Sequence, residues 1–159
     1  MTSAGFEDFV RARGRDLWRA AWLLTGDVHK AEDLLQTALA KSYRHYKGNE
    51  KTFESYVRTT MYRTFCSWWQ RKWRGEIPSS EHHEIASVDE SVEVSLDLAR
   101  ALAELPRNHR AVLVLRYYED RTIHEVSETL GLAEGTVKAY SHKALLALRA
   151  SRYLIEEEV

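Results

Sequence analysis

The sequence predicts an all-helical protein of two small domains that are joined by a flexible acidic linker. Apolar residues recur at the three- and four-residue spacing of helices, and no stretch alternates apolar and polar residues over the length of a strand. Only 2 Pro and 7 Gly interrupt the 159 residues. Residues 75–95 contain Pro, Ser and acidic side chains but no basic ones, which is typical of a connection between two domains.

The first domain, residues 1–74, is expected to contain three helices. The first helix, from Phe6 to Leu24, has an apolar stripe of Phe6, Phe9, Val10, Leu17, Ala20, Ala21 and Leu24. Asp27 suits the N-cap of a second helix from Val28 to about Tyr46, which would bury Ala31, Leu34, Leu35, Ala38, Leu39, Ser42 and Tyr43. The third helix runs from Phe53 to about Arg74, and the residues that can face the core are Tyr56, Val57, Thr60, Met61, Thr64 and Phe65.

Further aromatic residues of this third helix alternate with cations on more than one of its sides. The aromatic residues are Tyr62, Trp68, Trp69 and Trp73, and the cations are Arg58, Arg63, Arg71, Lys72 and Arg74. Flat rings can stack on unpaired bases while cations hold phosphates. We therefore predict a surface for single-stranded nucleic acid. The alternative is that the Trp residues fill the small core and the cations lie around them.

The second domain, residues 96–154, is expected to contain four helices. Leu96 to Leu105 forms the first and ends at Pro106; Arg107 to Tyr118 forms the next, which buries Val112, Leu113, Leu115 and Tyr117 or Tyr118. Residues 155–159 are an acidic tail.

The last two helices, between Thr122 and Arg149, predict a helix-turn-helix. Gly131 lies where the chain must leave the first of them, and Leu132 fills the corner. The second begins near Glu134 and has an apolar side of Val137, Ala144, Leu145 and Leu148. Its other face carries Thr136, Lys138, Tyr140, Ser141, His142 and Lys143, and no acidic residue lies between positions 136 and 148. Such a helix, about 24 Å long, suits a DNA major groove. An ordinary helical hairpin with a solvated polar face is the alternative.

The charges are distributed as local contact with nucleic acid requires. The net charge of the chain is −1, but residues 1–74 carry +6, residues 75–95 carry −6 and residues 96–154 carry +2. We find no catalytic residue set, no phosphate loop and no metal cluster, so no enzymatic activity, cofactor or metal is predicted. The adjacent His82, His83 and Glu84 lack a second ligand cluster at zinc spacing.

A reducing compartment is expected, because Cys66 is the only cysteine and cannot form an intramolecular disulfide. No apolar run approaches the roughly 18 residues of a membrane span, and Met1–Gly5 does not read as the start of a signal peptide. We therefore expect a cytoplasmic location without a membrane segment.

Taken in order, these segments resemble an extracytoplasmic-function (ECF) sigma factor of bacterial RNA polymerase, most closely the short, SigE-like actinobacterial group. The resemblance covers residues 6–74 and 96–150. The motifs that carry it are Ala31-Glu32-Asp33-Leu34-Leu35-Gln36, the segment 53–74, Leu105-Pro106 followed by Ala111-Val112-Leu113-Val114-Leu115-Arg116-Tyr117, and Glu134-Gly135-Thr136-Val137-Lys138.

The resemblance implies three contact sets. Core-polymerase docking on the clamp helices of the largest subunit would use Glu32, Asp33, Leu35 and Gln36. Capture of the single-stranded −10 element, with its melting, would use Arg58, Tyr62, Arg63, Trp68, Trp69, Arg71, Lys72 and Arg74. Reading of the −35 duplex would use Glu134, Thr136, Lys138, Tyr140, Ser141, His142 and Lys143. The second domain would also dock on the polymerase flap, and an anti-sigma factor is a further partner that the resemblance allows.

Two departures from the family pattern concern promoter sequence. Arg63 stands where many relatives carry Asn, and an Arg does not offer the paired donor and acceptor of an amide. Lys143 replaces the commoner Arg and loses bidentate reading of guanine. A different class of function, a free-standing helix-turn-helix regulator that does not engage core polymerase, remains as the alternative hypothesis.

Overall fold

The computed structural model describes residues 3–72 and 90–155, and every regular element within them is helical, as predicted. In chain order the elements are α1 (Ser3–Thr25), α2 (Val28–Ser42), a short 3₁₀ helix η1 (Tyr43–His45), α3 (Glu50–Lys72), α4 (Glu90–Ala103), α5 (Arg107–Leu113), a π-helix η2 (Val114–Tyr118), α6 (Ile123–Leu130) and α7 (Glu134–Arg149). Trp73, Arg74 and the His82-His83-Glu84 run lie outside the described residues.

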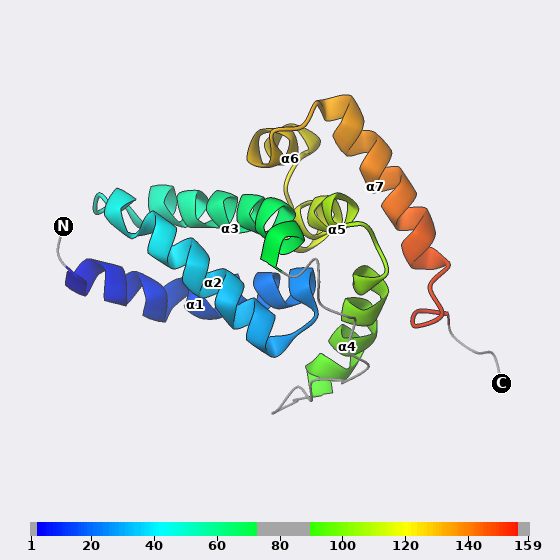
Figure 1. Ribbon diagram of the computed structural model, residues 1–159, viewed down its shortest axis with the longest axis horizontal. Coiled ribbons are helices and arrows are strands. Elements are labelled where there is room, and N and C mark those ends of the chain that lie inside the picture. Colours follow the sequence, from blue (N-terminus) through cyan, green and yellow to red (C-terminus); the bar gives the residue numbers. More distant parts are fainter. Residues whose placement is uncertain (1–2, 73–89, 156–159) are drawn as a thin grey trace.

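The first domain consists of α1, α2 and α3, which pack side by side (Figure 1). Asp27 caps α2 as predicted, because its carboxylate accepts a hydrogen bond of 2.9 Å from the backbone N–H of Lys30. The predicted stripe of α1 and side of α2 form the core together with α3, except for the half-buried Phe6 and Val10 and the exposed Tyr43. The largest fully buried side chains of this domain are Phe9, Leu17, Leu24, Leu34, Phe53, Val57, Met61, Tyr62 and Phe65.

Two expected core residues of the first domain are exposed. Tyr43 is 40% exposed, because α2 gives way to the tighter winding of η1 at this residue and its side chain leaves the buried side of the helix. Tyr56 is 41% exposed, and its ring lies 4.7 Å from that of His45 instead of in the core. The predictions that Tyr43 and Tyr56 face the core were therefore wrong.

The second domain begins earlier than predicted, since α4 starts at Glu90, inside the segment assigned to the linker. The helix that follows Pro106 changes its winding at Val114, where the N–H of Glu119 donates to the Val114 carbonyl at 3.0 Å. Tyr117 and Tyr118 are 57% and 44% exposed, so the prediction that one of them is inside was wrong. The wider π turn moves these two residues off the face on which Val112 and Leu115 are buried.

The two domains pack against each other and share one continuous cluster of buried apolar residues. Leu23 at the end of α1 faces Leu98 and Leu102 of α4. The guanidinium of Arg110, almost wholly buried on α5, donates to the carbonyl oxygen of Leu24 at 2.6 Å and to those of Ala103 and Leu105 at 3.1 and 3.0 Å. Arg110 therefore joins the C-terminal ends of α1 and α4, where partial negative charge accumulates.

The turn between α6 and α7 depends on the left-handed backbone of Gly131, whose φ is +67°. We expect Gly131→Ala to lower the free energy of unfolding by about 1 kcal/mol, because an L residue in this conformation is strained. Gly135→Ala is a matched control, since a Cβ at either position meets no atom within 4 Å and Gly135 is helical. The control should be neutral or stabilising by up to about 1 kcal/mol. Equal losses in urea denaturation would contradict this explanation.

Candidate polymerase and nucleic-acid interfaces

The helix-turn-helix is present with the predicted bounds and is fixed at both ends of α6. At its start, Thr122 and Glu125 form a capping box: the Glu125 N–H donates to Thr122 Oγ1 at 3.0 Å, and the Thr122 N–H donates to Glu125 Oε1 at 2.9 Å. Hydrogen bonding of the Glu125 carboxylate with the backbone N–H and then the hydroxyl of Thr122 lowers the pKa of Glu125. At its end, Ser127 Oγ donates to the Leu132 carbonyl at 2.5 Å. The Thr-x-x-Glu spacing was a readable signal that the sequence prediction did not use.

The recognition helix α7 presents part of its predicted DNA face to solvent. Glu134, Lys138, His142 and Lys143 are exposed and Thr136 is half-buried. Ser141 is only 8% exposed and lies on the buried side with Val137 and Ala144, so its assignment to the DNA face was wrong. Serine is small enough to be tolerated in this tightly packed stripe.

Tyr140 is only partly available to DNA in this structure. Its ring lies 4.5 Å from the imidazole of His109 on α5, at an interplanar angle of 35°. Burial, and then the nearby charge of Lys143, lowers the pKa of His109, which favours the neutral ring. Tyr140 therefore links the recognition helix to the body of its own domain, and Lys138, His142 and Lys143 make up the exposed cationic and polar face.

The predicted docking residues divide between the surface and the core of the first domain. Glu32 and Gln36 are exposed one turn apart on α2, and the Gln36 amide donates to Glu32 Oε1 at 3.0 Å. Asp33 is half-buried. Leu35 is only 6% exposed and packs in the core, so its place in a polymerase contact was wrong for this conformation. The exposed part of the predicted docking face is thus acidic and amide in character.

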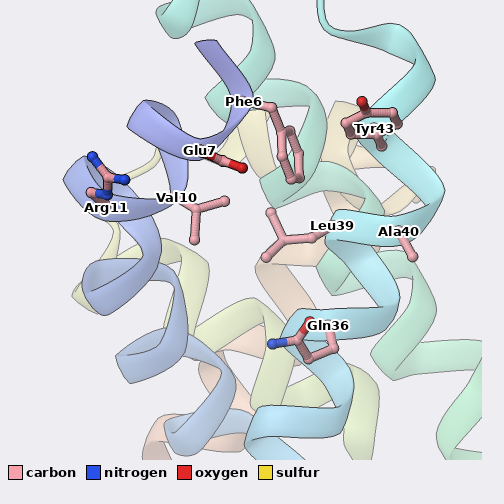
Figure 2. Close-up of a pocket in the computed structure, with 8 residues that line it drawn as sticks. All are labelled: Phe6, Glu7, Val10, Arg11, Gln36, Leu39, Ala40 and Tyr43. Atoms are coloured by element: carbon pink, nitrogen blue, oxygen red, sulfur yellow. The ribbon is translucent and has the colours of Figure 1, made fainter. Parts of the chain in front are cut away.

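An open apolar groove, which the sequence did not reveal, lies beside this face between α1 and α2. Its volume is about 490 Å³ and it is lined by Phe6, Glu7, Val10, Arg11, Gln36, Leu39, Ala40 and Tyr43 (Figure 2). Gln36 lines both the groove and the docking face. Phe6 and Val10, two apolar residues at the start of the α1 stripe, are only half-buried because they line this groove.

Two of the α3 cations predicted to hold single-stranded DNA, Arg58 and Arg63, contact the second domain, and Arg63 remains exposed to solvent. Arg58 forms an ion pair with Glu119, and a second one with Glu54 at 3.3 Å. Burial opposes the charge on Arg58, but Glu119 and Glu54 outweigh it and raise its pKa. Arg63 donates to the carbonyl oxygens of Thr129 and Glu128 in the last turn of α6, at 2.7 and 3.0 Å.

Tyr62 is fully buried, so the expectation that it would lie outside the core was wrong. Burial, and then the nearby charge of Glu119, raises the pKa of its hydroxyl well above the usual value. Its side of α3 is covered because the second domain packs there. Trp68, Trp69, Arg71 and Lys72 belong to the last turns of α3, where the structure describes the backbone but not these side chains.

Within residues 3–72 and 90–155, no group of three His, Cys, Asp or Glu side chains could hold a metal ion. No helix in the same part of the chain is long and apolar enough to cross a membrane.

Comparisons with known proteins identify both halves of the chain. The family model "Sigma-70 region 2" matches residues 9–75, and "Sigma-70, region 4" matches residues 101–150. The RNA polymerase sigma-E factor of Streptomyces avermitilis is 38% identical over 149 residues, which cover 91% of this chain and 83% of that protein. The ECF RNA polymerase sigma factor SigL of Mycobacterium tuberculosis is 36% identical over 84% of this chain and 80% of its own.

The fold also has a counterpart among solved structures. The sigma factor RpoE from Bartonella quintana, crystallised in complex with the anti-sigma factor NepR, superimposes with a TM-score of 0.68. The match covers 91% of this chain and 94% of that one at 22% sequence identity, so it supports the fold and not a particular residue's role.

Proposed function

The chain belongs to the ECF group of RNA polymerase sigma factors, and from this premise we propose how its surfaces divide the work of starting transcription. Core polymerase binds the exposed face of α2, the helix-turn-helix reads the −35 duplex, and α3 captures the opened −10 strand. The protein makes and breaks no covalent bond in this scheme; the polymerase supplies the chemistry. It acts where core polymerase is, in the cytoplasm.

The observation that carries this proposal is that one chain holds two opposite electrostatic surfaces on separate elements. Glu32 and Gln36 form an acidic and amide face on α2, while Lys138, His142 and Lys143 form a cationic face on α7. DNA repels the first face and attracts the second. A face that DNA repels is suited to a protein partner, and core polymerase is the partner that family membership indicates.

The recognition helix would read DNA mainly through its first three turns. Lys138 and Lys143 supply charge to phosphates or guanine, and His142 and Thr136 supply hydrogen-bonding groups. Neither lysine can make the bidentate contact of an Arg, so we propose that −35 discrimination in this chain relies less on paired guanine contacts.

The experiment that tests the function is in vitro transcription by bacterial core polymerase on a library of random promoters. We expect defined start sites that depend on this protein, with a shared sequence element upstream of each. A free-standing helix-turn-helix regulator would give no such starts and no stoichiometric complex with core polymerase in a pull-down. That alternative is not favoured, because the sigma-E relative aligns over 91% of the chain. An anti-sigma factor, as seen with RpoE, is a further partner to be sought by co-purification.

A further inference from the structure

We infer that His109 of α5 is a further contact of the −35 duplex, and that it takes up a proton when a DNA phosphate binds between it and Lys143. This inference deepens the proposed function and rests on the −35 role of α7. The predicted DNA face comprises residues of α7 alone, because a helical pattern does not show which part of another helix packs beside it. His109 is half-buried, so part of its ring is open to solvent.

The ring of Tyr140 positions His109 at the edge of the recognition helix. The two ring centroids lie 4.5 Å apart, with an interplanar angle of 35°. Aromatic rings at this distance attract each other, and α5 packs against α7. Tyr140 itself is half-buried, whereas Val137 and Ala144 of the same helix are fully buried. His109 therefore lies beside α7 at the boundary between its buried side and its exposed side.

Lys143, an exposed residue of the DNA face, lies on the same side of α7 as Tyr140. Residues three positions apart are neighbours on the surface of a helix. Burial, and then the charge of Lys143, lowers the pKa of His109, so the ammonium group and the imidazole are close in space. Two groups that can carry positive charge are thus placed side by side, one on α5 and one on α7.

The charged groups around His109 are cations. From α7, Lys143 and the phenol of Tyr140 face the imidazole. On its own helix, Arg107 and Arg110 donate to backbone carbonyl oxygens of α3 and α1, at 3.1 and 2.6 Å. Within residues 3–72 and 90–155, no carboxylate shifts the pKa of His109, although α1 and α3 also pack on α5. The pair of His109 and Lys143 therefore lacks a balancing anion in this part of the chain.

A phosphate of the DNA backbone has the chemistry to supply that anion. An ammonium group and an imidazolium both donate hydrogen bonds and accept none, and a phosphate offers several acceptor oxygens. A strand held by Lys143 brings its phosphate to His109. The negative charge then favours the protonated imidazole and opposes the effect of Lys143. The proton comes from solvent, and no covalent bond forms or breaks.

Protonation of His109 and binding of the duplex are therefore linked, and affinity rises as pH falls. In the free protein the pKa of His109 lies below its ordinary value; beside a phosphate it is higher. Between these two values the complex holds one more proton than the free protein, and each unit of separation raises affinity by up to about tenfold. The gain ends below the free pKa, because both states are then protonated.

The test is an NMR titration of the histidine rings in the full-length protein between about pH 5 and pH 8, with and without DNA. The probe is a mixed-sequence duplex of about 20 base pairs at about 50 mM salt, since phosphate contacts do not depend on sequence. We expect saturation with the duplex to raise the pKa of His109 by about one unit. The pKa of His29, exposed on α2 away from the DNA face, should stay unchanged.

Lys143→Ala and Lys138→Ala form a matched pair for the same titration, because each removes one charge from an exposed position of α7. In the free protein, Lys143→Ala should raise the pKa of His109, since the neighbouring positive charge is lost. Lys138→Ala should leave that pKa unchanged. At saturating duplex, the rise at His109 should be smaller in Lys143→Ala than in Lys138→Ala, because Lys143 holds the phosphate beside the imidazole.

Affinity for the same duplex, measured by fluorescence anisotropy, checks the linkage independently. His109→Gln keeps a hydrogen-bond donor but cannot be protonated. The wild type should gain about fivefold more affinity than His109→Gln between about pH 8 and pH 6. His142, already on the predicted DNA face, titrates in both proteins, so the comparison isolates His109. The control His29→Gln should keep the pH dependence of the wild type.

The outcomes separate this inference from the function on which it rests. If the duplex shifts resonances of α7 while the pKa of His109 stays unchanged, the inference is overturned and the −35 role of α7 stands. Equal pH dependence in the wild type and His109→Gln overturns the proton uptake in the same way. If the duplex shifts no resonance of α7, both the inference and the −35 role are overturned. The wild-type titration decides even if His109→Gln loses its helical circular dichroism spectrum.

Discussion

Glu32→Lys combined with Asp33→Lys is expected to abolish binding to core polymerase, with a loss in affinity of at least about a hundredfold. The change turns the acidic face of α2 cationic. Glu32 is exposed and is held by Gln36 through the 3.0 Å hydrogen bond along one helical turn. A surface that is complementary to a partner becomes repulsive when its charge is reversed, and the partner's own groups are then left unpaired.

The measurement is a titration of labelled core polymerase with each protein, together with circular dichroism. The spectrum should stay helical, because lysine is a good helix former and neither position is in the core. Asp8→Lys with Asp97→Lys is the matched control: it makes the same change in net charge at two exposed acids, each of which pairs with an Arg three residues away. Retained binding by the α2 variant, or equal loss in the control, would refute the docking assignment.

The second large effect is expected at the recognition helix. Lys138→Ala with Lys143→Ala should lower affinity for a −35 duplex about tenfold per lysine at low salt, and should reduce the slope of log K against log salt by about two in total. Both side chains are exposed on α7, so their truncation leaves the core of the helix-turn-helix intact. The salt slope is the informative quantity, since it counts the phosphate contacts that are lost.

Lys47→Ala with Lys51→Ala serves as the control for this experiment. Both lysines are exposed in the first domain, before and at the start of α3, and the net charge changes equally. The control should leave affinity and slope for the −35 duplex near those of the wild type. An unchanged slope in the α7 variant would mean that these lysines do not touch DNA, and the recognition face would have to be assigned elsewhere.

Helices were predictable from local sequence wherever caps and periodicity agreed. Asp27 predicted the start of α2, and Gly131 predicted the end of α6, because each residue satisfies a backbone requirement that its neighbours impose. The winding change at Val114 was not predictable in this way. The apolar pattern of this segment fits an α turn and a π turn equally well. Only the packing around Tyr117 and Tyr118 distinguishes the two.

The sequence predicted a candidate site residue correctly only where it also predicted that the side chain is exposed. Glu32, Gln36, Lys138 and Lys143 lie on faces opposite a clear apolar stripe, and they are exposed as expected. Leu35 and Ser141 stand next to such stripes, where a rotation of one residue decides between core and surface. The prediction for Tyr62 was wrong for another reason. Two sides of α3 are covered, and the sequence of α3 does not indicate which element covers the second side.

By itself the sequence determined that this protein is helical, where α2 begins and α6 ends, and which faces of α2 and α7 carry charge, because these properties depend on residues three or four positions apart. Only the tertiary structure decided that the two domains pack together, that Glu119 meets Arg58, and that Arg63 meets the end of α6. Those contacts join residues more than 60 positions apart, and they depend on how two apolar surfaces fit, which no local pattern encodes.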